Sequence, residues 1–225
     1  MEKEYIVKIL ETNYVTHDVK RFLVGRPKNF KFVPGQATYL SINLPEWKDA
    51  KRPFTFCSLN DDENLEFVIK IYKEKKGVTE KLAELKVGDE LIIREPFGTI
   101  QYKGNGVFIA GGGGITPFIA ILRELQRQGK LKDNTLIFSN KMEKDIILKE
   151  EFDSMISNGL KVIYTLTRER DKKYFYGRID EDFLKKNIEN FSQYFYVCGP
   201  IRFVGEIQHI LQKLGADSEA IVVES

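Results

Sequence analysis

The sequence predicts a two-domain protein: an antiparallel Greek-key β-barrel over residues 1–102, followed by a doubly wound α/β domain with a parallel sheet over residues 103–225. In the first part, short runs rich in β-branched and aromatic residues are separated by turn signals, which is typical of antiparallel strands. In the second part, strand-like and helix-like stretches alternate. Four consecutive glycines, residues 111–114, lie between the first strand and the first helix of that second part.

The barrel is expected to contain one helix, which begins after Thr79 as N-cap and ends before Gly88. Its strands alternate apolar and polar positions, as strands with one buried face do. These strands are predicted at residues 4–10, 20–24, 37–44, 52–59, 65–72 and 90–95.

The second domain is predicted to begin after the turn-forming residues 103–106. Strands alternating with helices imply right-handed crossovers and a parallel sheet with helices on both faces. The strands are predicted at residues 107–110, 135–139, 161–167, 194–198 and 220–223. The helices are predicted at residues 117–128, 145–157, 180–189 and 201–214.

Composition excludes several classes of protein. The 225 residues include 35 Lys and Arg against 33 Asp and Glu, for a net charge of +2, so no global nucleic-acid-binding surface is indicated. Neither the two cysteines nor the two histidines have the spacing of a metal site. The sequence lacks a signal-peptide pattern and an apolar run of membrane-spanning length. We therefore expect a cytoplasmic monomer with reduced thiols and no membrane contact.

The glycine run follows the first strand of the predicted parallel sheet, which is the usual phosphate-binding position in such sheets. Thr116 is expected to cap the next helix, and Pro117 suits its first turn. Backbone amides at that helix N-terminus would face an anion over the loop. An alternative is that the glycines only make a tight turn, because the Lys-Ser/Thr of a P-loop is missing.

The glycine run resembles the nicotinamide-nucleotide loop of the ferredoxin-NADP reductase family. The resemblance lies in the pattern Gly112-x-Gly114-Ile115-Thr116-Pro117. It implies that a nicotinamide dinucleotide lies over residues Gly112, Gly113, Gly114, Ile115, Thr116 and Pro117.

The stretch 52–58, RPFTFCS, is similar to the flavin-binding strand R-x-[YF]-[ST]-x-x-S of the same family. The resemblance implies that Arg52 pairs with a flavin pyrophosphate, that Phe54 packs beside the ring and that Thr55 lies near its N5 atom. Ser58 completes the motif. Read alone, the stretch is also compatible with an ordinary buried strand that has an arginine at its edge.

A second flavin motif of the family, G-x-[ST]-x-x-L, is similar to residues 77–82. By this resemblance Gly77, Val78 and Thr79 bind the pyrophosphate, although a helix cap would explain Thr79 equally well. The strand before it would place Ile69, Lys70 and Ile71 along the flavin and would let Tyr72 stack on an adenine. The pyrophosphate pairing favours FAD and leaves FMN open.

The reaction centre follows from two further matches. Cys198-Gly199-Pro200 resembles the C-G-P motif of the family, and Glu224 resembles its glutamate near the C-terminus. The resemblance implies that Thr55, Cys198 and Glu224 act where nicotinamide meets flavin. Cys198 is otherwise a small buried apolar residue, and Glu224 is otherwise a solvated one. Many members end with an aromatic residue over the flavin, whereas Ser225 follows Glu224 here.

The choice of coenzyme depends on basic residues at strand ends. Lys141, Arg168 and Arg178 match positions that bind the 2'-phosphate in NADPH-using members, which favours NADPH. A solvated basic rim explains the same residues and leaves NADH open.

The basic residues around both flavin motifs suggest docking of an acidic electron carrier such as ferredoxin or flavodoxin. Protection of strand edges is an alternative role for them. Other candidate functions are reduction of free flavin, ferric chelates or an oxygenase component. Two further alternatives are a non-catalytic electron-transfer subunit of a larger complex, as in dihydroorotate dehydrogenase, and a flavin-free nucleotide-binding regulator. The basic residues are Lys48, Lys51, Arg52, Lys73, Lys75, Lys76 and Lys81.

Overall fold

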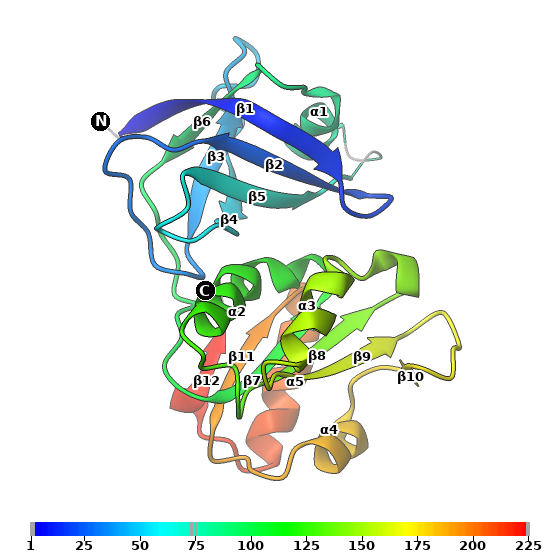
Figure 1. The fold of residues 1–225 in the computed structure, drawn as a ribbon. Coiled ribbons are helices and arrows are strands. Elements are labelled where there is room, and N and C mark those ends of the chain that lie inside the picture. Colours follow the sequence, from blue (N-terminus) through cyan, green and yellow to red (C-terminus); the bar gives the residue numbers. More distant parts are fainter. Residues whose placement is uncertain (1–2, 73, 75, 224–225) are drawn as a thin grey trace.

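The computed structural model describes residues 3–72, 74 and 76–223. It consists of two domains stacked one on the other (Figure 1). The N-terminal domain is an antiparallel six-stranded sheet, and the C-terminal domain is a parallel six-stranded sheet covered by helices. The predicted fold class is therefore confirmed.

The antiparallel sheet is barrel-like but not closed, with the strand order β4-β3-β6-β1-β2-β5. Among the described residues no ladder joins the edge strands β4 and β5. A single backbone hydrogen bond of 2.8 Å, from Cys57 N–H to Glu66 O, brings them together. The strands are β1 (Glu4–Tyr14), β2 (Val19–Gly25), β3 (Ala37–Ile42), β4 (Arg52–Thr55), β5 (Asn64–Lys70) and β6 (Glu90–Arg94).

Strand β4 is shorter than the predicted strand over residues 52–59. It pairs with β3 up to Thr55, and Phe56 N–H still donates to Gln36 O at 3.0 Å. The next amide, that of Cys57, donates to β5 instead. The chain thus passes from the edge of β3 to the edge of β5 at residues 56–57, which ends the strand.

The predicted helix of this domain is α1 (Val78–Glu84), but the expectation that Thr79 is its N-cap is wrong. Gly77, in an extended conformation, occupies the N-cap position. Thr79 lies inside the first turn, where its hydroxyl accepts a hydrogen bond from the backbone N–H of Tyr72 at 3.4 Å. Thr79 therefore joins α1 to the end of β5.

The parallel sheet has the order β10-β9-β8-β7-β11-β12. All predicted strands are present, and the short β10 is an additional one that pairs with β9. Only two residues form it, too few for a periodic pattern. The strands are β7 (Gly106–Gly111), β8 (Thr135–Asn140), β9 (Lys161–Leu166), β10 (Phe175–Tyr176), β11 (Tyr194–Cys198) and β12 (Ile221–Val223).

The four predicted helices are also present, with one division. In place of one helix over residues 145–157, the structure has a 3-10 turn, η3 (Glu143–Asp145), and a separate helix that begins at Lys149. Leu148, between them, adopts a left-handed backbone with φ of 51°. The α-helices are α2 (Thr116–Arg127), α3 (Lys149–Ile156), α4 (Glu181–Asn187) and α5 (Ile201–Lys213). Within the described ranges, no helix is long and apolar enough to cross a bilayer.

The glycine run does not lead directly into α2. Residues Gly112–Ile115 form a 3-10 turn, η2, and Thr116 is the first residue of the helix rather than its N-cap. The Thr116 hydroxyl donates to Gly113 O at 3.1 Å, so it braces the turn. Pro117 lies in the first turn of α2, as predicted.

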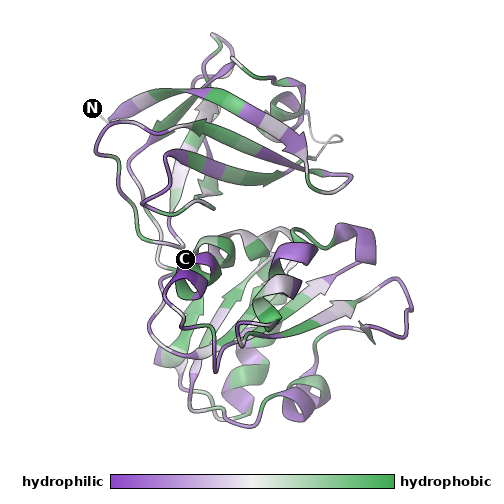
Figure 2. Cartoon of the chain, viewed as in Figure 1, coloured by the Kyte–Doolittle hydropathy of each residue, from purple (hydrophilic) through white to green (hydrophobic). Residues whose placement is uncertain are grey.

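Two apolar cores cover the two faces of the parallel sheet. Helices α2 and α3 pack on the face toward the antiparallel domain, and α4 and α5 pack on the opposite face (Figures 1 and 2). The first of these cores also contains Val19, Cys57 and Val68 of the antiparallel domain. The two domains therefore share this core, while the antiparallel domain has a second core of its own around Phe22, Phe56 and Phe67.

The connection between the domains runs from the end of β6 to the start of β7, and the boundary predicted between residues 102 and 103 falls within it. Tyr196 of β11 anchors this connection. Its hydroxyl accepts hydrogen bonds from the N–H groups of Lys103 (2.8 Å) and Gly104 (3.0 Å) and donates to Gly104 O (2.8 Å). Because Tyr196 is fully buried in the parallel sheet, its hydrogen bonds hold the connection against that sheet.

Candidate active site

A cleft of about 400 Å³ lies between the domains, at the carboxyl ends of β7 and β11. This is the edge of a parallel sheet at which ligands bind. The cleft is called here the main cleft. It brings together residues from the two flavin motifs, the strand before the second of them, the glycine loop and the C-G-P motif. Its predicted lining residues are Phe54, Thr55, Ile69, Lys70, Tyr72, Thr79, Gly113, Gly114, Thr116, Cys198, Gly199 and Pro200.

The glycine loop forms the floor of the main cleft. Gly112 has a φ of +52°, a left-handed conformation that favours glycine. A Cβ on Gly114 would stand 2.3 Å from Cys198 O, so this glycine permits the turn η2 to pack closely against the end of β11. A Cβ on Gly113 would meet only Lys70 Cβ, at 4.0 Å. Gly113 is thus the glycine whose missing side chain leaves room in the cleft itself.

The antiparallel domain supplies the opposite wall. Three consecutive residues, Pro53, Phe54 and Thr55, line it, because β4 ends there and the two-residue alternation of a strand stops. Arg52 is exposed and donates to Lys51 O at 2.7 Å. Ser58 is buried beneath β5, where its hydroxyl accepts from Glu66 N–H at 3.1 Å. Neither Arg52 nor Ser58 lines the main cleft.

A second cleft, of about 490 Å³, adjoins the main cleft and shares Lys70 and Tyr72 with it. Ile71, Lys141 and Arg168 also line this second cleft. The half-exposed ring of Tyr72 therefore stands between two connected spaces, opposite basic side chains of the parallel domain.

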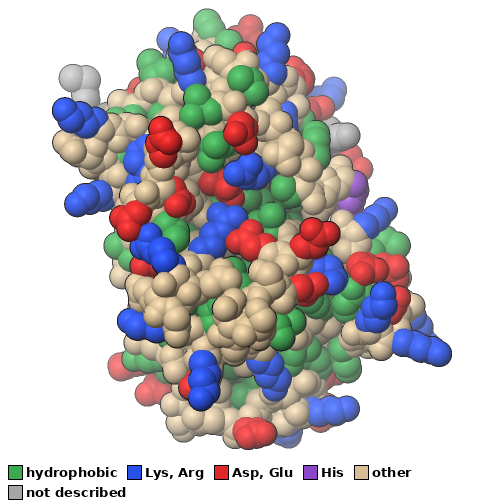
Figure 3. Space-filling model, in the orientation of Figure 1, with side chains coloured by type: hydrophobic (Ala, Val, Ile, Leu, Met, Phe, Trp, Pro, Cys, Tyr) green, Lys and Arg blue, Asp and Glu red, His purple; other side chains and the backbone are tan. Residues whose placement is uncertain are grey.

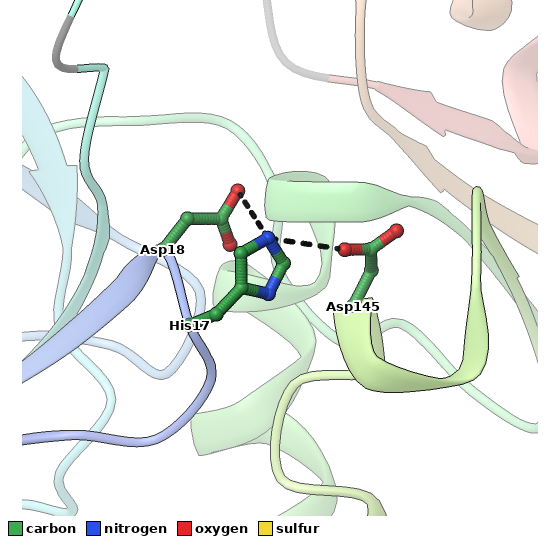
Figure 4. Close-up of side chains that lie close together, drawn as sticks. All are labelled: His17, Asp18 and Asp145. Carbon is green, nitrogen blue, oxygen red and sulfur yellow. Dashed lines mark ion pairs between the residues drawn. The ribbon is translucent and has the colours of Figure 1, made fainter.

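The edge of the second cleft holds a cluster of His17, Asp18 and Asp145, which come from both domains (Figure 4). His17 Nε2 lies 3.7 Å from Asp18 and 3.6 Å from Asp145. Although these are metal-binding residue types, Lys70 already forms an ion pair with Asp18 at 2.8 Å. Its positive charge disfavours a cation there, so the geometry indicates an electrostatic contact between the domains.

Lys70 also affects the protonation of Asp18. Burial alone would raise the pKa of Asp18, but the hydrogen bond and charge of Lys70 outweigh it and hold this pKa below its usual value. Asp18 is thus a carboxylate at neutral pH, and it fixes the Lys70 ammonium beside both clefts.

A third cavity, of about 220 Å³, lies at the carboxyl ends of β8 and β9 beside the N-terminus of α5. Ser139, Thr167, Arg178 and Arg202 line it. The three basic residues predicted to bind a 2'-phosphate are therefore divided, with Arg178 here and Lys141 and Arg168 in the second cleft.

Several predicted residues line none of these three spaces. Ile115 is fully buried in the core, and Glu224 lies outside the described residues. Conversely, Ala37, Val68 and Ile147 line the main cleft without belonging to any predicted motif. Small apolar side chains carry no chemical signal of their own, so only the fold could identify them. The other predicted residues outside these linings are Arg52, Ser58, Gly77, Val78, Gly112 and Pro117.

The residues present fit a flavin dinucleotide. The main cleft combines an apolar wall from Pro53, Phe54 and Ile69 with hydroxyls from Thr55 and Thr79, as a flat ring with a polar edge requires. The adjoining second cleft offers an aromatic ring and basic side chains to the remainder of a long ligand.

Family comparisons agree with this geometry. Residues 7–102 match the family model described as an oxidoreductase FAD-binding domain. Residues 108–209 match the one described as an oxidoreductase NAD-binding domain. The two halves of the chain together define a flavin-dependent NAD(P)H oxidoreductase.

Curated relatives are electron-transfer reductases. NADH-cytochrome b5 reductase 1 of Homo sapiens is 30% identical, with 95% of this chain and 83% of the human protein covered. NADH-cytochrome b5 reductase 2 of Mycosarcoma maydis is 31% identical, with 77% of this chain covered, and the match spans 57% of the fungal protein.

Solved structures share the fold. The ferredoxin NADP+ reductase from Neisseria gonorrhoeae, with bound FAD and NADP, gives a TM-score of 0.88 at 20% identity and covers 100% of this chain and 99% of its own. The cytochrome b5 reductase domain of Ulva prolifera nitrate reductase gives 0.86 at 21%, covering 98% and 97%. This chain belongs to the ferredoxin-NADP reductase-like family and is an FAD-dependent NAD(P)H reductase.

Proposed function

We propose that this reductase oxidises NADPH in the main cleft and passes the electrons to an acidic one-electron protein carrier of the ferredoxin or flavodoxin type. The observation that carries the choice of carrier is the group of basic residues beside the flavin wall, in a chain of net charge only +2. Lys48 and Lys51 precede β4, and Lys76 precedes α1. Lys73 and Lys75, also predicted to take part, lie outside the described residues.

The chemistry that bound FAD supplies is the conversion of one hydride donor into two one-electron deliveries. Phe54 and Ile69 hold the ring from its apolar side, and Thr55 offers its hydroxyl at the ring edge. Arg52 and the α1 N-terminal residues Gly77 and Val78 bind the pyrophosphate. The exposed Arg52 guanidinium suits this role because its fork matches phosphate oxygens.

On the opposite side, the backbone of the glycine loop receives the nicotinamide dinucleotide. Cys198 and Gly199, at the end of β11, line the main cleft on the floor side, facing Thr55 on the wall. The small side chains there let the nicotinamide approach the flavin ring within the short distance that hydride transfer needs, roughly 3–3.5 Å. Glu224 is proposed to position or protonate this centre.

The preference for NADPH rests on arginine. Arg178 and Arg202 share the third cavity with the hydroxyl residues Ser139 and Thr167, a set that suits a phosphate monoester. An acidic residue would bind the ribose diol of NADH. Among the described residues that line this cavity only Glu206 is acidic, and its carboxylate is paired with Arg202 at 2.7 Å. Lys141 and Arg168 are the alternative phosphate ligands, at the second cleft.

A second carrier deserves a direct comparison, because the curated relatives are named as cytochrome b5 reductases. A cytochrome b5-type haem protein is also a one-electron acceptor. The docking surface proposed here selects an acidic carrier by charge, and the experiment below distinguishes iron-sulfur, flavin and haem carriers.

The test compares NADPH-dependent reduction of ferredoxin, flavodoxin, cytochrome b5 and a small uncharged quinone at increasing salt. Because exposed charges are screened over about 8–10 Å at physiological salt, the rate with a docked acidic carrier should fall steeply while the rate with the quinone does not. Lys76→Glu should slow the carrier alone. Lys186→Glu, on the distant helix α4, is the matched control. Parallel salt curves, or equal effects of the two variants, would reject the docking surface.

A further inference from the structure

One face of α2 is turned toward the antiparallel domain, and Arg123 is its central contact. The Arg123 NH1 group donates to Cys57 O at 2.7 Å and to Glu66 Oε1 at 2.9 Å, both in the other domain. Its Nε and NH2 groups donate to the Glu151 carboxylate of α3 at 2.6 and 2.9 Å. A single guanidinium thus joins three segments from two domains.

The charges around Arg123 are balanced and largely buried. The Glu66 side chain is 8% exposed, and it also accepts from Arg21 Nε and NH2 at 2.9 Å. Two arginines therefore face two carboxylates. Burial alone would lower the pKa of Arg123, but the hydrogen bond to Glu151 and the charge of Glu66 outweigh it and keep this pKa above its ordinary value. The guanidinium is permanently charged and its partners are fixed.

The contact of Arg123 joins the two segments that continue into the main cleft: the one that forms its wall in the antiparallel domain and the one that forms its floor at the glycine loop. Cys57 follows Thr55 by two residues, and its thiol lies 3.7 Å from Thr55 O. On the other side, Arg123 stands two helical turns after Thr116, the first residue of α2. The Cys57 thiol also lies 3.9 Å from Thr116 O. Holding the Cys57 carbonyl to α2 therefore fixes Thr55 relative to the glycine loop.

We propose that Arg123 is a positioning residue for hydride transfer: by binding Cys57, Glu66 and Glu151 together, it sets the spacing between the flavin wall and the nicotinamide floor. The inference rests on the proposed roles of those two walls. Arg123 itself does not line the main cleft, so it acts through Cys57 and α2.

Other charged contacts between the domains are more exposed. Arg127, one turn further along α2, pairs with Asp61 at 2.8 Å, but the two side chains are 44% and 78% exposed. Exposed pairs of this kind contribute little. In Figure 3 acidic and basic side chains are mixed along the seam between the domains. The contact of Arg123 is distinguished by its burial and by its four hydrogen bonds. The contrast provides a matched control on the same helix.

The experiment separates the two half-reactions. FAD-loaded wild type, Arg123→Lys, Glu151→Gln and Arg127→Ala are mixed anaerobically with NADPH over a range of concentrations, and the limiting rate of flavin reduction is measured. Pre-reduced protein is then mixed with ferricyanide. Because a misplacement of about 1 Å can cost roughly 100-fold, Arg123→Lys should lower the limiting rate 10- to 100-fold. A lysine keeps the charge but lacks the fork that reaches three partners.

Reoxidation by ferricyanide requires no alignment of the two walls, so it should be unchanged in every variant, and Arg127→Ala should match wild type throughout. General damage would instead slow both half-reactions together. Glu151→Gln keeps the size of the side chain but leaves only one of the two oxygens that accept from Arg123, so it should give a smaller fall of the same kind. A limiting rate equal to wild type in flavin-loaded Arg123→Lys, or equal losses in both half-reactions, would overturn the inference. If wild-type flavin is reduced by neither NADPH nor NADH, the proposed function fails instead.

Discussion

Gly114 and Cys198 meet backbone to backbone at the floor of the main cleft: a Cβ at position 114 would stand 2.3 Å from the carbonyl oxygen of Cys198. The close contact explains one of the four consecutive glycines without any ligand. It packs the turn η2 against the end of β11 and so places Cys198 beside the glycine loop. Gly113, by contrast, borders open space in the cleft.

Alanine substitutions should separate these two roles. Gly114→Ala forces a methyl group into backbone, so we expect a loss of unfolding free energy of about 3 kcal/mol, the upper end of the usual overpacking range. Gly113→Ala should leave the melting temperature unchanged and raise the KM for NADPH severalfold. Thermal unfolding and steady-state kinetics on both variants check this, and a reversed pattern would contradict the assignment of Gly113 to the coenzyme.

Thr55→Ala should slow reduction of the flavin by NADPH while the protein stays folded and yellow. If the hydroxyl contributes one ordinary hydrogen bond, the rate should fall about 2- to 12-fold. Stopped-flow absorbance measures this rate. Thr135→Ala, at the opposite end of the parallel sheet, serves as control. Equal rates in wild type and Thr55→Ala would remove Thr55 from the mechanism.

The basic residues of the second cleft and third cavity should differ in their effect on coenzyme choice. Loss of a charge-assisted hydrogen bond costs about 1.5–3 kcal/mol, so Arg178→Ala should lower the NADPH-to-NADH ratio of kcat/KM by roughly 10- to 100-fold. Arg168→Ala should change the ratio less. Should Arg168→Ala produce the larger change, the 2'-phosphate lies in the second cleft, beside Lys141.

The two cysteines should react differently with thiol reagents. Burial, followed by the charge of Glu66, raises the pKa of Cys57 to about 12, and its side chain has no exposed surface. Because the thiolate is the reactive form, Cys57 should resist iodoacetamide at pH 8 until the protein unfolds. Cys198 borders the main cleft and should be the site of any labelling in the native protein, with NADP+ slowing it. Peptide mass mapping would reveal a contrary order.

Acid should weaken the contact at the second cleft. The folded pKa of Asp18 lies below its usual 3.8, so its contribution to stability is present above that value and is lost as the pH falls through the folded pKa. Asp18→Asn should therefore show a shallower decline of melting temperature between about pH 5 and pH 2 than wild type. Asp182→Asn, on the exposed start of α4, should follow the wild-type curve.

The order of strands and helices could be predicted because each element carries its own local pattern, as in the apolar, β-branched and aromatic run of β5 and the apolar stripe of α2. The ends of elements could not, because they depend on distant partners. Strand β4 stops at Thr55 since the Cys57 amide pairs with Glu66, a choice made by the three-dimensional position of β5. Residue type alone predicts Thr79 and Thr116 as N-caps. In the structure Gly77 is the N-cap of α1, and the turn η2 precedes α2.

Much of the candidate site could be predicted as well, since most of its residues belong to contiguous motifs at strand ends. The separation of Arg178 from Arg168 could not be foreseen, because it depends on where the chain turns after β9. Arg123 did leave a signal. It is an arginine in a helix that buries seven of its twelve residues, and such a charge needs a buried partner.

The apolar core shared by the two domains also limits how the chain could be recombined. Val19, Cys57 and Val68 pack into the same core as α2, so a cut at the connection would expose apolar surface on both pieces. Chimeras that exchange one half with a relative must therefore carry over both sides of this contact. In this reductase the flavin and nucleotide modules are interchangeable only as a matched pair.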